Sequence, residues 1–257
     1  MPVKSSQSGL RILAALEKIA DHQPVGVTEL ARLLGCDLAA AQRAIATLAE
    51  AGWIRMAPGK PTRWELTAHI HTVAQHAYGT RDLRRRARGP LEELWRETGE
   101  SVLLNVPDGG KFVVIDVFES PRYVRSAPPV GLLVPARASA TAWAMLPYMS
   151  AELQRAYLGE VPDAELLEQY SRTLERGYAV SHGDVFAGST NIAAPVFEVD
   201  GTPIGAVLIS VPNDRAGFDE ISRLGKLVLA TAQRLSRGTA ARAKHDQSSK
   251  TPQLGEY

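Results

Sequence analysis

Residues 9–54, GLRILAALEKIADHQPVGVTELARLLGCDLAAAQRAIATLAEAGWI, decide the fold of the first part of this chain. Apolar residues recur there at the three- and four-residue spacing that places them on one face of a helix. The spacing predicts three helices, over residues 9–20, 29–34 and 38–51. Because only a short glycine-containing turn separates the second helix from the third, the pair has the pattern of a helix-turn-helix.

Residues at the predicted helix ends agree with these boundaries. Ser8, Thr28 and Asp37 stand where a side-chain oxygen can accept a hydrogen bond from the first backbone amides of each helix. Gly35 and Gly52 follow the second and third helices, and glycine readily adopts the left-handed conformation that ends a helix. The expected buried stripe of the third helix consists of Ala41, Ala44, Ile45 and Leu48.

Two short extended segments, residues 53–56 and 63–66, flank the turn Pro58-Gly59-Lys60-Pro61. This pattern is typical of a β-hairpin. A hairpin placed directly after a helix-turn-helix forms a wing. We therefore predict a winged helix-turn-helix, with a generic small helical subdomain as the alternative.

A winged helix-turn-helix places one helix in the major groove of DNA. Here that recognition helix is residues 38–51. Gln42 can pair with adenine, and Arg43 with guanine or a phosphate. Thr28 and the helix amides beside it can hold a phosphate. The candidate outward positions of the recognition helix are Leu38, Ala39, Ala40, Gln42 and Arg43, and the candidate wing contacts to the DNA backbone are Arg55, Lys60 and Arg63. Each wing cation can equally serve solubility alone.

The charge distribution agrees with two parts that have different partners. The 257 residues contain 29 Lys plus Arg and 28 Asp plus Glu, a formal net charge of +1. Counted along the chain, residues 1–90 carry +6, residues 91–234 carry −7 and residues 235–257 carry +2. A basic first part suits a nucleic-acid partner, although such a split also arises by chance.

Residues 67–98 are expected to form a helical linker. A polar helical stretch over residues 67–87 ends in an arginine cluster, and we expect Gly89-Pro90 to break the helix before it resumes over residues 91–98. The cluster consists of Arg81, Arg84, Arg85, Arg86 and Arg88. We interpret it first as a solvated face and second as a phosphate-contacting face.

Strand patterns dominate the second half of the chain. The expected strands are residues 101–106, 111–118, 123–127, 178–181, 192–199 and 204–211, and the expected helices are 140–146, 151–158, 164–176 and 218–236. Because strands and helices are grouped rather than alternating, the fold class is α+β with a mainly antiparallel sheet. The expected domains are a winged helix-turn-helix (1–66), the linker (67–98), an effector-binding domain (99–236) and a disordered tail (237–257).

Composition sets the broad class. Hydrophobic residues are 45% and charged residues 22%, as in ordinary globular proteins. No stretch has the apolar length of a membrane-spanning helix, the first ten residues lack the apolar core of a signal peptide, and Cys36 is the one cysteine, so no internal disulfide is possible. We expect a cytoplasmic protein without a membrane partner.

Four segments together resemble the IclR-type family of bacterial transcriptional regulators. They are the segment quoted above, ERGYAV (175–180), GSTNIAAPV (188–196) and IGAVLISVP (204–212). The resemblance covers about residues 8–236. It implies a GAF- or profilin-like effector domain, a palindromic double-stranded DNA operator, and a homodimer or a dimer of dimers. We expect no cofactor. Ala39 and Ala40 depart from the family, which often carries hydroxyl residues at these positions.

The resemblance also implies an effector pocket. Asn191 takes the position of the family's frequent pocket cysteine, and Ser181 that of a loop residue that is often Asp. Leu208 and Ser210, two residues apart on one strand face, match positions where some relatives have two serines. Leu133, with its neighbours, is a candidate for an apolar lid or a plain core strand. The expected effector is a small organic acid or an aromatic metabolite. Arg137 can pair a ligand carboxylate, or serve the surface.

Three rival interpretations are weaker. The run Ser181-His182-Gly183-Asp184 contains the residue types of a hydrolase triad, but neighbours in sequence rarely point at one centre. The histidines His69, His71 and His76 do not share one helix face, which disfavours a metal site. We therefore expect no enzyme and no metal. The serious alternative to a DNA-binding regulator is a ligand-sensing module whose helix-turn-helix serves dimerisation.

Overall fold

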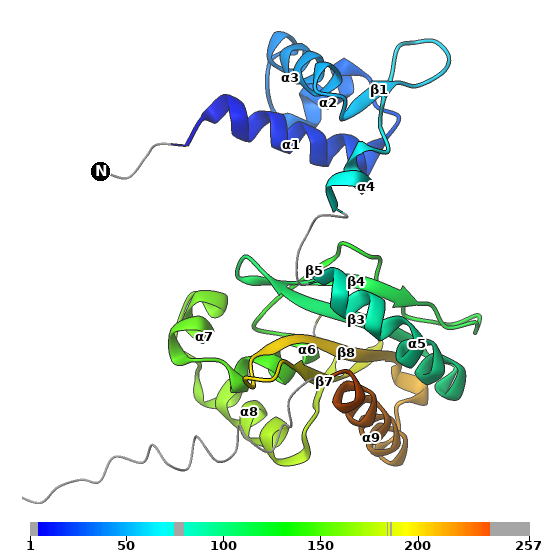
Figure 1. Ribbon diagram of the computed structural model, residues 1–257, viewed down its shortest axis with the longest axis vertical. Coiled ribbons are helices and arrows are strands. Elements are labelled where there is room, and N and C mark those ends of the chain that lie inside the picture. The colour runs from blue at the N-terminus through cyan, green and yellow to red at the C-terminus, as the bar shows by residue number, and fades with distance from the viewer. Residues whose placement is uncertain (1–4, 75–79, 184, 186, 237–257) are drawn as a thin grey trace, which may run out of the picture. The chain divides into compact units, whose positions relative to one another are not determined.

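The fold is seen in a computed structural model, which describes residues 5–74, 80–183, 185 and 187–236. The chain divides into two compact units, residues 1–78 and 79–257, and each is considered by itself (Figure 1). The expected disordered tail, 237–257, lies outside the described residues, as do His76 and Asp184.

The first unit is a winged helix-turn-helix, as predicted. Its elements are α1 (Gln7–His22), α2 (Val27–Leu34), α3 (Leu38–Glu50), β1 (Ile54–Met56), β2 (Trp64–Leu66) and α4 (His69–Ala74). The strands β1 and β2 pair antiparallel. One hydrophobic core joins α1, α2, α3 and the hairpin, with Ile19, Leu30 and Leu48 buried at its centre.

Two of the three predicted helix caps are wrong. Ser6, not Ser8, caps α1, because its hydroxyl accepts a hydrogen bond from the Gly9 amide at 3.2 Å and so starts the helix earlier. Gly26, not Thr28, is the cap of α2. The backbone of Val25 pairs with that of Trp64 in the hairpin, so the chain stays extended up to Val25 and turns into the helix directly afterwards. Asp37 caps α3 as predicted, accepting from the Ala40 amide at 2.7 Å.

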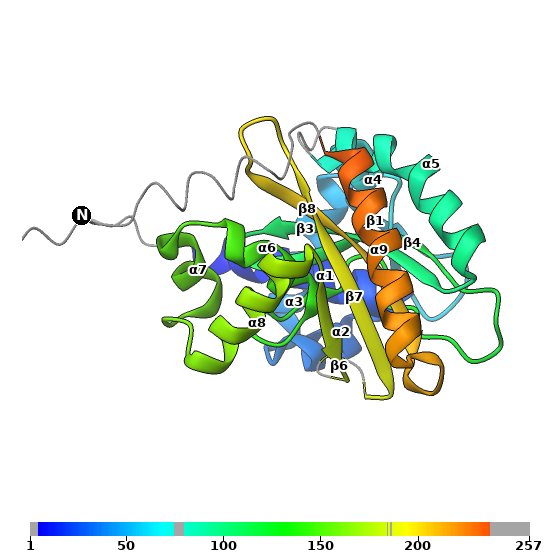
Figure 2. The same ribbon diagram turned by 90° about the horizontal axis from the view of Figure 1, so that it is seen from below.

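The second unit is a six-stranded antiparallel sheet with helices on both faces (Figures 1 and 2). Its strands are β3 (Ser101–Asp108), β4 (Lys111–Phe118), β5 (Leu133–Val134), β6 (Ala179–His182), β7 (Ser189–Phe197) and β8 (Pro203–Pro212), in the spatial order β5-β4-β3-β8-β7-β6. Its helices are α5 (Thr80–Thr98), α6 (Ala140–Met145), α7 (Ala151–Leu158), α8 (Ala164–Arg176) and α9 (Phe218–Leu235), and two short 3₁₀ turns, η1 (Leu146–Tyr148) and η2 (Asn213–Arg215), complete it.

The two faces of this sheet hold separate cores. On one face α5 and α9 pack over the sheet, with Leu91, Leu224 and Ile209 in the same cluster. On the other face lie α6 and α8, and Met145 and Phe112 belong to that second cluster. Because side chains alternate along a strand, each central strand contributes to both cores. The α+β class with a mainly antiparallel sheet is thus confirmed.

The predicted break at Gly89-Pro90 is wrong, because α5 runs through both residues. Its apolar residues Leu83, Leu91 and Leu94 are buried in the core shared with the sheet. This packing holds the helix together although proline lacks one backbone donor. The expected linker is therefore divided at residue 78, and α5 belongs to the second unit.

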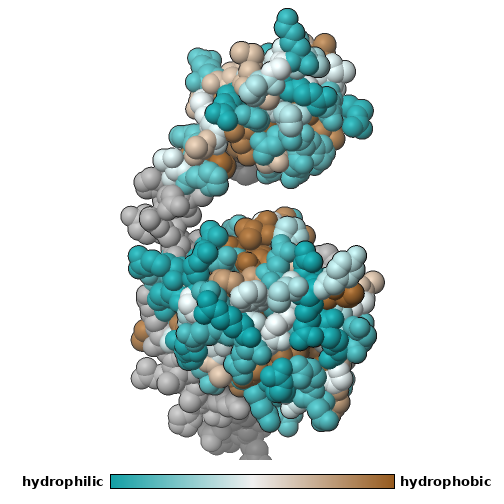
Figure 3. Space-filling model, turned by 90° about the vertical axis from the view of Figure 1, so that its right-hand side faces the viewer, coloured by the Kyte–Doolittle hydropathy of each residue, from teal (hydrophilic) through white to brown (hydrophobic). Residues whose placement is uncertain are grey.

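The strand expected over residues 123–127 is not formed. Tyr123 is 99% exposed, and the edge of β4 is already paired with β5 through Phe112 and Val134. This segment remains a loop. Figure 3 shows one face of each unit, largely hydrophilic with scattered hydrophobic patches. Of the helices described, none is both long and apolar enough to cross a bilayer.

Candidate functional site

The exposed face of α3 carries four of the five predicted recognition residues. Leu38, Ala39, Gln42 and Arg43 are solvent-exposed. Ala40 is 3% exposed and packs into the helical core, so its placement on the outward face is wrong. The reason is the helical period, because Ala40 precedes the buried Ala44 by four residues and shares its face.

The beginning of α2 offers unpaired backbone donors. Its cap, Gly26, makes no side-chain hydrogen bond to the first amides of the helix. Thr28 lies at the second position of α2. A helix start with free amides attracts an anion, which suits a DNA phosphate.

The three wing cations differ in their partners. Arg55 forms an ion pair with Glu65 at 2.8 Å across the hairpin. Arg63 donates to the Pro24 carbonyl at 2.7 Å and lies 3.3 Å from Glu29. Lys60, at the hairpin tip, is exposed and has no ion pair with any described residue. Among the wing cations, Lys60 is therefore the one whose charge is most available to a phosphate.

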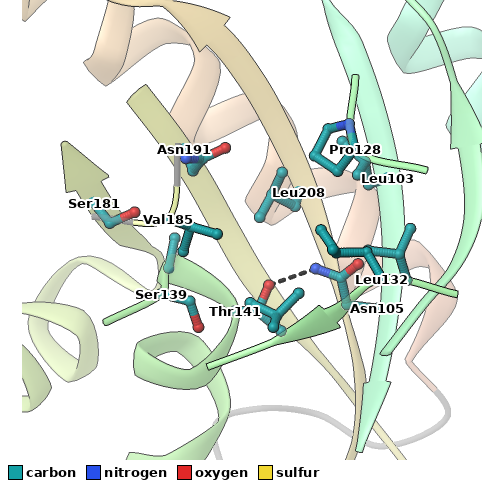
Figure 4. Close-up of a pocket in the computed structure, with 13 residues that line it drawn as sticks. Leu103, Asn105, Pro128, Leu132, Ser139, Thr141, Ser181, Val185, Asn191 and Leu208 are labelled. Atoms are coloured by element: carbon teal, nitrogen blue, oxygen red, sulfur yellow. Dashed lines mark hydrogen bonds between the residues drawn. The ribbon is translucent and has the colours of Figure 1, made fainter. Parts of the chain in front are cut away.

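The second unit contains a small cavity between the sheet and the segments that cross it, with a volume of about 20 Å³ and partly open to solvent (Figure 4). Leu103 and Leu208 lie on the sheet side, and Leu132 and Val185 come from loops. The other lining residues are Asn105, Val114, Pro128, Val134, Ser139, Ala140, Thr141, Ser181 and Asn191. None of these described residues is charged, so polarity comes only from amides and hydroxyls.

Three of the predicted effector residues meet at this cavity. Ser181 and Asn191 are directly opposite each other in the β6–β7 pairing, so their side chains are neighbours on one face. The Ser181 hydroxyl is buried and has no hydrogen-bond partner among the described residues. The Asn191 amide makes one long contact, donating to the Ser189 hydroxyl at 3.4 Å. Leu208 lies beside them on β8. Ser181 lies on strand β6 rather than in the loop that the resemblance implied.

Two predicted effector residues are not among those that line the cavity. Leu133 is 52% exposed, because alternation along β5 turns its neighbours Leu132 and Val134 inward and Leu133 outward. Ser210 is fully buried on the same strand face as Leu208 but is not among the lining residues. Leu133 therefore faces away from the cavity, whereas Ser210, which pairs with Asn191 across β7 and β8, stays a prediction.

Asn105 and Thr141 line the cavity, and neither was predicted. The Asn105 amide nitrogen donates to the Thr141 hydroxyl at 2.5 Å, and both residues are buried. The only sequence signal was a single asparagine within the otherwise apolar run of residues 102–106. That pattern places Asn105 on the face of Leu103 but does not say which face carries the cavity.

Among the described residues, which exclude His76 and Asp184, no geometry supports the rival interpretations. Ser181 and His182 follow each other on β6, so their side chains project to opposite faces of the sheet. Arg137 forms ion pairs with Glu160 and Asp163 and does not line the cavity. A hydrogen bond from the Leu166 amide lowers the pKa of Asp163, and the Arg137 guanidinium lowers it further. Within the described part of the chain, no group of three or more His, Cys, Asp or Glu residues is placed to hold a metal.

Comparison with known proteins gives the same assignment for both units. Residues 8–58 match the IclR helix-turn-helix domain, and residues 75–237 match the bacterial transcriptional regulator IclR C-terminal domain. The transcriptional repressor IclR of Escherichia coli is 28% identical, over 90% of this chain and 89% of that protein.

Two solved structures share the fold. An IclR transcriptional regulator from Alicyclobacillus acidocaldarius has a TM-score of 0.75 at 21% identity, covering 91% of this chain and 98% of its own. An IclR homolog from Microbacterium hydrocarbonoxydans, complexed with 4-hydroxybenzoate, has a TM-score of 0.75 at 16% identity and covers 90% and 99%. With both family domains matched along nearly the whole chain, this DNA-binding transcriptional regulator belongs to the IclR family.

Proposed function

We propose that this regulator binds a palindromic operator as a homodimer, or as a dimer of dimers, and that a small organic acid or aromatic metabolite in the second-unit cavity controls this binding. The observation that carries the proposal is a cavity that holds an unpaired, buried Ser181 hydroxyl inside an apolar wall. Buried polar atoms are normally hydrogen-bonded, so such an atom beside empty space is typical of a ligand site.

Base reading falls to Gln42 and Arg43 on α3. They are the polar members of its exposed face near the helix start, and both can contact base edges in pairs of hydrogen bonds. Thr28 and Lys60 contact phosphates and set the register of the helix in the groove. Because Leu38 and Ala39 are apolar, they contribute contact with thymine methyl groups at most.

The lining of the cavity favours an effector with an aromatic or other apolar body. Leu103, Leu132 and Leu208 offer contact area, and the described lining has no cation to neutralise a carboxylate. The carboxylate of an organic acid would therefore rely on hydrogen bonds from the Ser181 hydroxyl and the Asn191 amide. The complex of the Microbacterium hydrocarbonoxydans homolog with 4-hydroxybenzoate supports an aromatic effector.

The effector acts on DNA affinity rather than as a substrate, and the protein works in the cytoplasm without catalysis. Effector and operator are coupled only if the effector binds more tightly to one arrangement of the dimer than to another. The relatives that match this chain are transcriptional regulators, which supports this role over an enzymatic one.

One experiment tests both halves of the proposal. The full chain is used to select duplexes from a random pool, and the affinity for the selected duplex is measured with and without organic acids and aromatic metabolites that raise the melting temperature. We expect a selected palindrome, and an affinity that changes with at least one stabilising compound. If no duplex is enriched although compounds bind, the chain is instead a ligand-sensing dimerisation module.

A further inference from the structure

One end of the Asn105 side-chain amide is hydrogen-bonded within the protein, and the other end is not. Its nitrogen donates to the Thr141 hydroxyl at 2.5 Å, while its oxygen has no hydrogen-bond partner among the described residues. Asn105 is 1% exposed and Thr141 is fully buried, so bulk water does not satisfy that oxygen. Figure 4 shows the amide nitrogen turned to Thr141 and the oxygen on the other side, at the cavity.

An unpaired buried amide oxygen discriminates between chemical groups. A hydroxyl or N–H group placed against it forms a hydrogen bond that the empty site lacks. A carboxylate placed there would bring a second acceptor, and a charge, against the oxygen without a cation among the described lining residues. One N–H of the Asn105 amide donates to Thr141, and the amide oxygen is the atom of this group that lacks a partner among the described residues.

We propose that Asn105 is the specificity-determining residue of the effector site: it accepts a hydrogen bond from a hydroxyl or N–H group of the effector, and Thr141 holds its amide in that orientation. The inference rests on the proposed effector site. It adds the chemical group that the effector must carry at the Asn105 end of the cavity.

The second polar end of the cavity lies at Ser181 and Asn191. In the sheet, Asn105 is paired with Ala206 and Asn191 with Ser210, on opposite edges of β8. Those partners are four residues apart, so the two asparagine positions are separated by about 13 Å along β8 and about 10 Å across it. Their side chains take up part of that separation, and Leu208 lies between them.

This placement of the polar ends calls for an effector with polar groups at opposite ends of an apolar body, such as one ring. One end is a neutral donor, such as a phenol hydroxyl or an amine, against Asn105. The other end is a polar group that the Ser181 hydroxyl and the Asn191 amide can bind. The apolar ring contacts Leu208 and Leu132 between them.

The test uses a series of ring compounds that differ at one position. The probes are benzoate and its 4-hydroxy, 4-amino, 4-methyl and 4-carboxy derivatives, and dissociation constants for the full chain are measured by calorimetry. We expect the 4-hydroxy and 4-amino compounds to bind about tenfold or more tightly than the 4-methyl and 4-carboxy compounds. In Asn105→Leu this preference should disappear, and in Thr141→Val it should weaken. Asn213→Leu, outside the cavity, is the matched control and should keep it.

The outcomes separate this inference from the effector site itself. The assignment of Asn105 is wrong if the 4-methyl or 4-carboxy probe binds as tightly as the 4-hydroxy probe. It is also wrong if the preference for the 4-hydroxy probe survives in Asn105→Leu. In both cases the compounds still bind, so the proposed effector site is retained. If none of the probes binds the unmodified chain, both this inference and the proposed ring-containing effector fail. Melting curves show whether Asn105→Leu and Thr141→Val remain folded. If Asn105→Leu loses the preference because it does not fold, the preference is measured in Asn105→Ser instead.

Discussion

At the scale of single residues, Arg43 is the side chain on which operator reading depends most. It lies exposed on α3 and makes no side-chain ion pair with a described residue, so its guanidinium is available to a base edge. We predict that Arg43→Ala weakens binding to the selected operator by about 1–3 kcal/mol and relaxes specificity at one base position. Fluorescence anisotropy against the operator and single-position variants measures both effects.

The matched control is Arg155→Ala on α7. It removes the same charge from an exposed helix position in the second unit, away from the predicted recognition helix. Operator affinity should be unchanged in this variant. An equal loss in both variants would mean that Arg43 contributes only general charge, and an unchanged affinity in Arg43→Ala would remove it from the interface.

Asn191 supports a second prediction at this scale. Its amide is 6% exposed, lines the cavity and has only a long contact with Ser189. Asn191→Leu keeps a similar volume but removes both hydrogen-bonding groups, so we predict that it abolishes the effector response while leaving effector-free operator binding intact. Thermal shift and duplex binding measure the two properties separately. A variant that still responds normally would show that the effector binds elsewhere.

At the scale of single residues, the sequence predicted where a site residue lies along the chain better than which other residues it contacts. Asn191 and Leu208 could be placed at the site because strand periodicity and the family resemblance both concern position along the chain. Asn105 could not be found, because its role depends on Thr141, 36 residues away on α6. Leu133 failed for a related reason: only the pairing of β5 with β4 determines which of three apolar neighbours turns inward.

At the scale of elements, one glycine, Gly225, allows α9 to pack closely against the Tyr178 ring. A side-chain carbon at Gly225 would come within 2.3 Å of the Tyr178 ring, so α9 packs at this distance only because the side chain is absent. We predict that Gly225→Ala lowers the free energy of unfolding of the second unit by about 1–3 kcal/mol, since the ring or the helix must move. Urea denaturation of the full chain, followed at the transition of the second unit, measures it.

Gly89 provides the matched control on α5. It is also a helical glycine, but a side-chain carbon added there would meet nothing within 4 Å, and the residue is exposed. Gly89→Ala should therefore raise the free energy of unfolding by up to about 1 kcal/mol, because alanine is the better helix former. The same change is thus expected to have opposite signs on α5 and α9. Equal effects would contradict the close packing of Tyr178 on Gly225.

Element boundaries were predictable where neighbouring residues alone determine them. Asp37 caps the helix that the sequence assigned to it. The break at Gly89-Pro90 was wrong because the burial of Leu83, Leu91 and Leu94 outweighs a local preference. Local rules describe the chain before it packs, so they fail where a helix is held by a distant surface.

At the scale of the whole molecule, the charge split changes when the structural boundary is used. With the division at residue 78, the first unit carries 8 Lys plus Arg against 6 Asp plus Glu, a net charge of only +2. The second unit carries 21 against 22, a net charge of −1. The arginines that made the first 90 residues basic belong to α5. DNA affinity therefore depends on where the few cations of the first unit lie, not on its total charge.

This redistribution leads to the last prediction, which concerns salt dependence. Each phosphate contact adds about one unit to the slope of log affinity against log salt concentration. Lys60 has no ion pair with a described residue, whereas in α5 Arg84 pairs with Asp116, and Arg85 and Arg86 with Asp82. We predict that Lys60→Ala lowers the slope by about one unit for each copy bound, and that Arg84→Ala and Arg85→Ala leave it unchanged. Binding to a fixed duplex across a salt series measures the slopes. If the α5 variants lower the slope as much as Lys60→Ala does, the arginine cluster contacts phosphates after all, and the DNA-binding surface extends beyond the first unit.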